Sequence, residues 1–225
     1  MSTPPSTDPF IFIDCEMTGL SPSTDSILSL CCYITSPHLR LLSPTPYEAY
    51  ITHPPSVLAA MSQWCLDHHG RSGLVARCSD ASRSTDAATA ARGLLDYMKD
   101  LGVQPQRGVM AGNSIHCDRE FLRRDIHWNE VVEYLSYRIL DVSSFKEGVR
   151  RWGAGKGGVL EGVPGKEGRH EAKRDIEESI EEMRYYRRVL FGLGDEEEEG
   201  EGRERGEDAG VMGKGERTGK GGEGG

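Results

Sequence analysis

Long apolar runs, paired cysteines and an excess of basic charge are all missing from this sequence. No stretch of about 18 or more apolar residues occurs, so no membrane-spanning helix is expected. The six cysteines form no Cys-x-x-Cys pair, so no zinc cluster is expected; they are typical of reduced thiols in an intracellular protein. The segment Met1–Pro9 lacks the layout of a secretory signal and the arginines of a mitochondrial presequence. We therefore expect a cytoplasmic protein by default.

The acidic balance of the chain is concentrated in its C-terminal segment. The formal net charge is −9, of which −6 falls in residues 194–225, leaving −3 for the rest. Proteins that grip long nucleic acid usually carry a strongly basic surface, because their affinity comes from neutralising many phosphates. A nucleic-acid substrate of this chain should therefore be short and held in a pocket.

The 225 residues are enough for one domain, and no internal repeat occurs. Residues 1–9 form a polar lead-in that we predict to be disordered, and residues 10–193 should form the domain. Residues 194–225 contain 12 glycines and the acidic run Asp195–Glu199. Such a segment cannot bury enough apolar surface to offset its ordering entropy, so we predict a disordered tail. A solvating role without a specific partner is its simplest interpretation.

Hydrophobic periodicity within the domain predicts strands first and then alternating helices and strands. The expected strands are Phe10–Asp14, Ser26–Thr35, Tyr47–Thr52, Gly108–Ala111 and Tyr137–Leu140. The expected helices are Asp80–Asp100, Cys117–Arg124, Val142–Trp152 and about Glu171–Leu190, the last preceded by a glycine-rich loop. This order predicts an α/β fold with a mixed sheet and helices on both faces.

Two acids close the first expected strand. Residues two apart share a face of a strand, so Asp14 and Glu16 project together while Cys15 points the other way. Like charges this close repel, and one would titrate upward unless a cation lies between them. A solvated strand end is the alternative interpretation of this pair.

A third acid is expected on the inner face of a helix. Ile115 and Leu122 lie three residues before and four residues after Asp118, so the aspartate shares their inward side. A buried carboxylate without a partner costs several kcal/mol, and a metal ion is the simplest partner. The alternative is an aspartate tilted out to solvent.

His170 and Asp175 complete the set. Five residues apart on one helix they would not share a face, so we place His170 in the preceding loop and Asp175 in the first helical turn. A surface histidine near a helix terminus is the alternative for His170. Four oxygen donors without a thiolate suit Mg²⁺ or Mn²⁺, and a neutral imidazole suits a general base.

These residues, in this order, lie in segments that resemble the DEDDh exonucleases of the ribonuclease H-like superfamily, and within them the oligoribonucleases. The segments are Ile13-Asp-Cys-Glu-Met-Thr-Gly-Leu20, Trp64 with His69-x-x-Ser72-Gly-Leu74, Gly112-Asn-Ser-Ile-x-x-Asp-Arg-x-Phe-Leu122, Tyr137-Arg-x-Leu-Asp-Val-Ser143, His170-x-Ala-x-x-Asp175 and Ser179-Ile-x-x-Met-Arg-Tyr-Tyr-Arg187. The resemblance covers about Phe10 to Leu190. It implies a three-layer ribonuclease H-like fold with a mixed five-stranded sheet.

The resemblance also implies an activity, which is 3′→5′ hydrolysis of RNA of two to five nucleotides, with 5′-phosphorylated dinucleotides as the preferred substrates. Two divalent ions would be bound by four acids, namely Asp14, Glu16, Asp118 and Asp175. His170 would be the general base. Related eukaryotic enzymes act in mitochondria, which makes that compartment the alternative to the cytoplasm.

Six further residues would bind the substrate if the resemblance holds. Leu20 would be a wedge between two bases, and Trp64 a stacking platform. His69 and Ser72 would form part of a cap on the 5′ phosphate, completed by Tyr137 and Arg138 of a second copy in an obligate homodimer. Core packing is the alternative for Leu20, Trp64 and Tyr137.

Several positions depart from the family pattern or have a simpler explanation. Ser21 and Ser29 stand where the family commonly has acids, and the segment before His170 is unusually rich in glycine. Asp141 is better explained as a helix N-cap than as a ligand. Two rival functions remain, a proofreading-type DNA exonuclease and an inactive nucleotide-binding module.

Overall fold

The computed structural model describes residues 7–153, 159, 162–165 and 172–193. The predicted tail, most of the lead-in and His170 lie outside these residues. Of the lead-in, Asp8 forms an ion pair with Arg107 (2.6 Å) and the carbonyl of Pro9 accepts a hydrogen bond from the Val109 amide (2.9 Å). The description below concerns the compact unit that ends at Gly192. None of its described helices is both long and apolar enough to cross a membrane.

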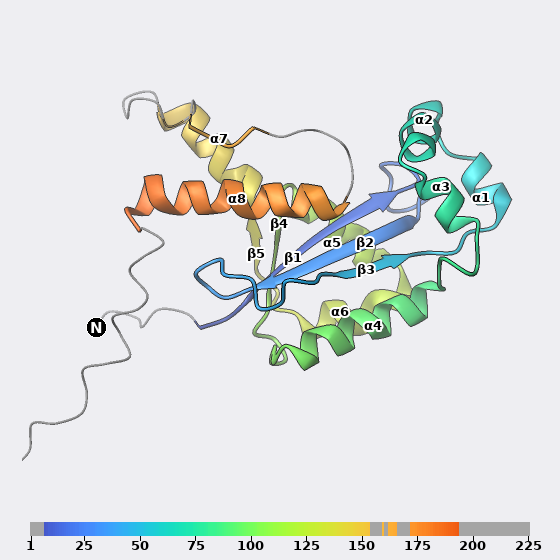
Figure 1. The fold of residues 1–225 in the computed structure, drawn as a ribbon, viewed down its shortest axis with the longest axis horizontal. Helices are drawn as coiled ribbons and strands as arrows, with labels where there is room; N and C mark the ends of the chain where they lie inside the picture. Colours follow the sequence, from blue (N-terminus) through green and yellow to red (C-terminus); the bar gives the residue numbers. More distant parts are fainter. Residues whose placement is uncertain (1–6, 154–158, 160–161, 166–171, 194–225) are drawn as a thin grey trace, which may run out of the picture. The chain divides into compact units, whose positions relative to one another are not determined.

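Five strands form one mixed sheet in the order β3-β2-β1-β4-β5 (Figure 1). They are β1 (Phe10–Met17), β2 (Ile27–Thr35), β3 (Tyr47–Tyr50), β4 (Val109–Gly112) and β5 (Ile139–Asp141). Strand β2 pairs antiparallel with both β1 and β3, whereas β1, β4 and β5 run parallel. The predicted mixed sheet is confirmed.

The alternation of side chains along β1 decides where its acids point. Ile11, Ile13 and Cys15 pack on one face, in the same apolar cluster as residues of α4 (Ala87–Asp100), α5 (Ile115–Arg124) and α6 (Asn129–Tyr134). Phe12 packs on the other, against α7 (Val142–Trp152) and α8 (Ala172–Phe191). Figure 1 shows α7 and α8 on one side of the sheet and α4 and α6 on the other. Since residues two apart share a face, Asp14 and Glu16 continue the face that α8 covers.

Three short helices between β3 and α4 were not predicted. They are α1 (Pro55–Ala59), α2 (Gln63–Arg71) and α3 (Leu74–Cys78), packed with the start of β2 around Leu28. Helices of five to nine residues show too few turns for a periodic pattern to be visible. Helix α6 and the 3₁₀ turn before it, Ile126–Trp128, were missed for the same reason.

Several expected boundaries were wrong by a few residues. Helix α4 begins at Ala87 rather than at Asp80, because Asp80 accepts hydrogen bonds from Ser82 in a local turn and Asp86 caps the helix. Strand β5 begins at Ile139, so the expected start at Tyr137 was wrong. Strand β1 continues to Met17, which places its two acids inside the strand rather than at its close.

Candidate active site

Three of the four predicted acids meet in space. Carboxylate oxygens of Asp14, Glu16 and Asp175 lie within 4.8 Å of one another. The first two project from β1, and Asp175 comes from the first turn of α8, as expected for that helix. Residues about 160 positions apart in the chain are thus joined because α8 packs along the face of β1 that carries the acids.

Burial and neighbouring carboxylates both act on the ionisation of Glu16 in this cluster. The pKa of Glu16 is raised to about 8, first by burial and then by the carboxylates of Asp175 and Asp118. A carboxylate whose pKa is raised by neighbouring carboxylates is part of a site that a cation would stabilise, because a cation favours the charged forms. All the donors are hard oxygen atoms, which fits a hard divalent cation.

Asp118 lies on the inner side of α5 and is buried, as predicted from its spacing to Ile115 and Leu122. Its pKa is raised to about 7, chiefly by burial. A metal ion was the simplest partner expected for this carboxylate, and the structure shows a further partner within the protein. Its Oδ1 accepts a hydrogen bond from the backbone amide of Cys15 at 2.9 Å, which lowers the pKa and partly offsets burial. This hydrogen bond joins α5 to β1 at Cys15, the residue between Asp14 and Glu16 in the sequence.

Leu20 lies at the tip of the turn after β1 and is 95% exposed, so core packing does not explain it. Asp25 holds this turn, since its carboxylate accepts hydrogen bonds from the Thr18 hydroxyl and the Ser21 amide. A Cβ atom on Gly19 would lie 2.5 Å from an oxygen of Asp25, so a larger residue would displace this carboxylate.

Trp64 is 54% exposed at the start of α2, which again excludes core packing. Its ring is stacked on His68, with 3.9 Å between the ring centroids. A stacked, exposed indole is a suitable surface for a nucleobase.

His69, which was expected to form part of a cap on the 5′ phosphate, is buried beside the acid cluster. It is only 3% exposed, its Nε2 donates to the carbonyl of Met17 at 3.0 Å, and its Nδ1 lies 3.9 Å from a Glu16 oxygen. Its imidazole is therefore directed at the acid cluster. Ser72, at the end of the same helix, is exposed and lines the pocket beside Glu16.

Tyr137 and Arg138 lie outside the sheet, in the segment before β5, and both are exposed. The guanidinium of Arg138 stacks on the Tyr137 ring, with 4.5 Å from its carbon to the ring centroid. Tyr137 is therefore not a core residue. The two side chains form one exposed, stacked unit.

Sequence reasoning missed a buried polar network beneath the cluster. Glu182 of α8 is 0% exposed and accepts hydrogen bonds from the Tyr186 hydroxyl (2.9 Å) and from Nδ2 of Asn113 (3.3 Å). Ser179, Glu182 and Tyr186 are spaced by three and four residues, so polar residues on an apolar helical stripe were the available signal. Asp141 caps α7 as predicted, its Oδ1 accepting from the Ser143 amide at 2.9 Å.

Comparison with known proteins agrees with this geometry. Residues 11–183 match the family described as Exonuclease. The chain is 43% identical to the oligoribonuclease of Shewanella loihica over 185 residues, which cover 81% of this chain and 96% of that protein. It is 40% identical to the mitochondrial oligoribonuclease of Saccharomyces cerevisiae over 184 residues, 79% of this chain and 66% of the yeast protein. The mitochondrial oligoribonuclease of Mus musculus is 36% identical over 183 residues, 80% of this chain and 73% of the mouse protein.

Solved structures are similar in fold. Exonuclease I of Methylocaldum szegediense matches 81% of this chain and 41% of its own with a TM-score of 0.55 at 16% identity. The Escherichia coli exonuclease I complex with single-stranded DNA matches 82% and 41% with a TM-score of 0.56 at 15% identity. The five-stranded sheet is thus the ribonuclease H-like exonuclease fold. Together with the family match over most of its length, this shows that the chain belongs to the oligoribonuclease family of 3′→5′ exoribonucleases.

Proposed function

We propose that this exoribonuclease hydrolyses RNA of two to five nucleotides, preferring 5′-phosphorylated dinucleotides, and releases nucleoside 5′-monophosphates. The observation that carries the proposal is the convergence of Asp14, Glu16 and Asp175 within 4.8 Å. The cluster lies at the strand that continues into the exposed Leu20.

Asp14, Glu16, Asp118 and Asp175 would bind two divalent cations, and we propose Mg²⁺ or Mn²⁺ because every donor is a carboxylate oxygen. When bound, such a pair supplies charge stabilisation for in-line displacement at phosphorus. His170, outside the described residues, is proposed as the general base that takes a proton from the attacking water. His170 stands only five positions before Asp175 in the sequence, so the two would lie in one site.

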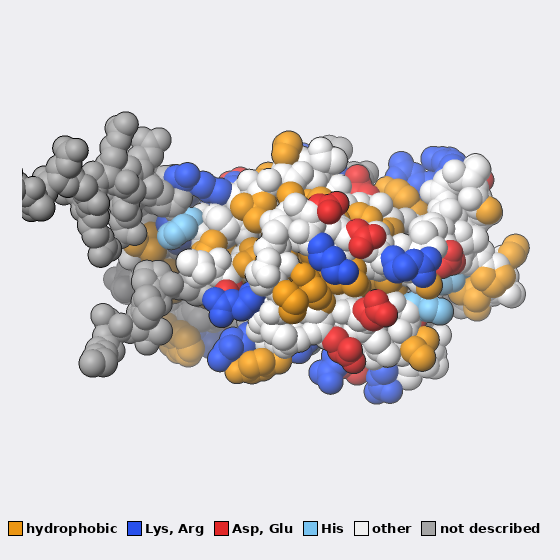
Figure 2. All heavy atoms as spheres, turned by 90° about the horizontal axis from the view of Figure 1, so that it is seen from below, with side chains coloured by type: hydrophobic (Ala, Val, Ile, Leu, Met, Phe, Trp, Pro, Cys, Tyr) orange, Lys and Arg blue, Asp and Glu red, His pale blue; other side chains and the backbone are white. Residues whose placement is uncertain are grey.

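A short substrate fits the charge of the molecule. On the face shown in Figure 2, the Lys and Arg side chains are interspersed with Asp and Glu, and no broad basic track runs across it. Affinity would then come from a few contacts, with Trp64 stacking on a base at about 1–3 kcal/mol and Leu20 between two bases.

We propose a cap that limits substrate length. Ser72 and His69 would close one side of the 5′ phosphate, and Tyr137 with Arg138 of a second copy the other, in a homodimer. The exposure and stacking of Tyr137 and Arg138 support this arrangement. His69 would contribute through its place beside Glu16.

Turnover of a 5′-phosphorylated dinucleotide, with and without Mg²⁺ or Mn²⁺, tests the reaction. We expect hydrolysis only with the metal, and a higher kcat/KM than for an RNA of about ten nucleotides, because a closed cap excludes longer chains. A preference for the longer RNA would contradict the cap. Faster cleavage of single-stranded DNA of about 20 nucleotides would favour the proofreading-type function. No turnover of any substrate would favour the inactive module.

The compartment is a separate question. Two relatives are named as mitochondrial, those of yeast and mouse, which favours mitochondria over the cytoplasm. Imaging the full-length protein with a C-terminal tag in its own cells would decide between them.

A further inference from the structure

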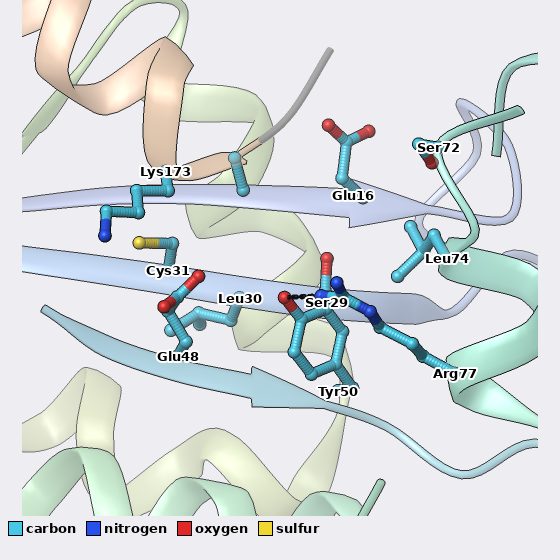
Figure 3. Close-up of a pocket in the computed structure, with 11 residues that line it drawn as sticks. Glu16, Ser29, Leu30, Cys31, Glu48, Tyr50, Ser72, Leu74, Arg77 and Lys173 are labelled. Atoms are coloured by element: carbon cyan, nitrogen blue, oxygen red, sulfur yellow. Dashed lines mark hydrogen bonds between the residues drawn. The ribbon is translucent and has the colours of Figure 1, made fainter. Parts of the chain in front are cut away.

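A polar pocket of about 250 Å³ lies beside the acid cluster, with Glu16 on one wall (Figure 3). Its other lining residues come from β2, β3, α3 and the start of α8, and Ser72 lies at one end. Apart from Glu16 and Ser72, none of the lining residues was singled out as a substrate contact above. The pocket therefore adjoins the acid cluster through residues that have no role assigned above.

Strand pairing explains why the pocket is there. Glu16 of β1 pairs with Ser29 of β2, and Ser29 pairs with Tyr50 of β3, so the three side chains form one row across the same face. Strands lie about 4.8 Å apart, which puts Glu16 and Tyr50 about 10 Å apart at the backbone. The small Ser29 between them leaves the hollow. Serine in place of the acid common in the family thus opens the pocket floor.

A fixed positive charge reaches into this pocket. Arg77 extends from α3 across the pocket, where its Nη1 donates a hydrogen bond to the Tyr50 hydroxyl (Figure 3). The guanidinium carbon lies 4.7 Å from the centroid of the Tyr50 ring. One neutral residue therefore holds the guanidinium through both its ring and its hydroxyl.

Arg77 has no ion-pair partner among the described residues, although the carboxylates of Glu16 and Glu48 line the same pocket. No carboxylate of the described residues lies within ion-pair distance of it, and its other side-chain donors have no hydrogen-bond partner there. Nor is Arg77 needed to dock α3, since Leu74 and Cys78 of that helix are buried and the Cys78 thiol donates to the Leu28 carbonyl. A preorganised guanidinium with spare donors is suited to the oxygens of a phosphate group.

We propose that Arg77, held by Tyr50, binds a phosphate group of the RNA substrate within the proposed active site. This inference rests on the proposed function. Two phosphates of a dinucleotide are in reach of such a pocket, the scissile one at the Glu16 end and the 5′-terminal one at the Ser72 end. Both offer the same chemistry, and the experiment separates them.

The test compares Arg77→Ala, Arg77→Lys and Tyr50→Phe with a matched control, Arg92→Ala, which removes an exposed arginine from α4 on the opposite face of the sheet. Each is assayed for kcat/KM on a dinucleotide with and without its 5′ phosphate. We expect Arg77→Ala to lower kcat/KM by about ten- to a hundredfold, the scale of a charge-assisted hydrogen bond. Arg77→Lys should recover only part of the lost kcat/KM, because an ammonium group lacks the planar pair of donors that a guanidinium presents. Tyr50→Phe should lower kcat/KM by about threefold.

The outcomes separate the two phosphates. An effect of Arg77→Ala that disappears without the 5′ phosphate assigns Arg77 to that phosphate; an effect that persists assigns it to the scissile one. A kcat/KM no lower than that of Arg92→Ala on both substrates overturns the inference.

Binding of the dinucleotide, measured by calorimetry in a metal chelator, tests the inference independently of turnover. If wild type binds the dinucleotide but does not cleave it when Mg²⁺ or Mn²⁺ is supplied, and Arg77→Ala still weakens binding in the chelator, the proposed function fails and the phosphate site stands. Equal binding by both proteins overturns the site.

Discussion

Asn113, in the turn between β4 and α5, donates a hydrogen bond from Nδ2 to the hydroxyl of Ser179 on α8 at 2.7 Å. The same hydroxyl donates to the backbone carbonyl of Asp175, also at 2.7 Å. Oδ1 of Asn113 accepts from the Ser143 hydroxyl at 3.1 Å. One amide thus joins the turn that leads to Asp118 with the helical turn that carries Asp175.

The substitution Asn113→Ala should therefore weaken metal binding by more than the loss in free energy of unfolding alone would explain. Loss of buried hydrogen bonds costs about 1–3 kcal/mol. We expect weaker Mn²⁺ affinity and a lower kcat with little change in KM, measured by calorimetry and steady-state kinetics. Tyr134→Phe is the matched control, because it removes a hydrogen bond of similar length (2.6 Å, to the Val103 carbonyl) far from the acids. If both variants lose the same stability and keep the same Mn²⁺ affinity, Asn113 has only a structural role.

Asp118→Asn should abolish hydrolysis and leave the fold intact. The amide keeps an oxygen that accepts from the Cys15 amide, while the negative charge needed for a cation is lost. Losing a metal ligand should remove several kcal/mol of transition-state stabilisation, so activity should fall below about a tenth of wild type. Asp118→Ala should also be inactive but less stable, because it leaves the buried Cys15 N–H without an acceptor. An Asn variant with near-normal activity would contradict the metal role.

The metal-free protein should lose stability as the pH rises through the neutral range. The folded-state pKa values of Glu16 (about 8) and Asp118 (about 7) lie above the ordinary values of 4.5 and 3.8, so the folded state binds more protons in between. The protonated carboxyls of Glu16 and Asp118 therefore contribute their full stabilisation, on the order of a few kcal/mol, below about pH 4. This stabilisation is lost as the pH rises through 7 to 8. Melting temperatures from pH 5 to 9 in a chelator would show this decline.

Saturating Mn²⁺ should reverse that decline, because the cation favours the charged carboxylates. Glu16→Gln in the chelator supplies the control, since it removes one of the two titrating groups and should flatten the curve. A melting temperature that is independent of pH in the wild-type chelated protein would show that these acids are not perturbed in solution.

His170→Ala should lower kcat by about 10²–10⁴-fold, the usual contribution of a general base, with little change in Mn²⁺ affinity. The pH profile of kcat distinguishes loss of a general base from loss of structure. The fall in kcat at acidic pH, which reports protonation of the base, should disappear in the variant. His127→Ala, at an exposed histidine beyond α5, is a suitable control. An unchanged rate would place the base elsewhere.

The sequence by itself determined which residues share a face. Strand alternation placed Asp14 with Glu16, helical spacing turned Asp118 inward, and the distance from His170 placed Asp175 in the first turn of α8. These relations depend only on the periods of strand and helix, which are local properties of the backbone.

Only the tertiary structure decided which neighbours these residues meet. The Cys15 amide reaches Asp118 across 103 positions, and Asn113 reaches Ser179 across 66. Arg77 meets Tyr50, and His69 turns toward Glu16 instead of solvent. Such contacts depend on where each helix crosses the sheet. That crossing is set by the packing of the whole core, which local periodicity does not encode.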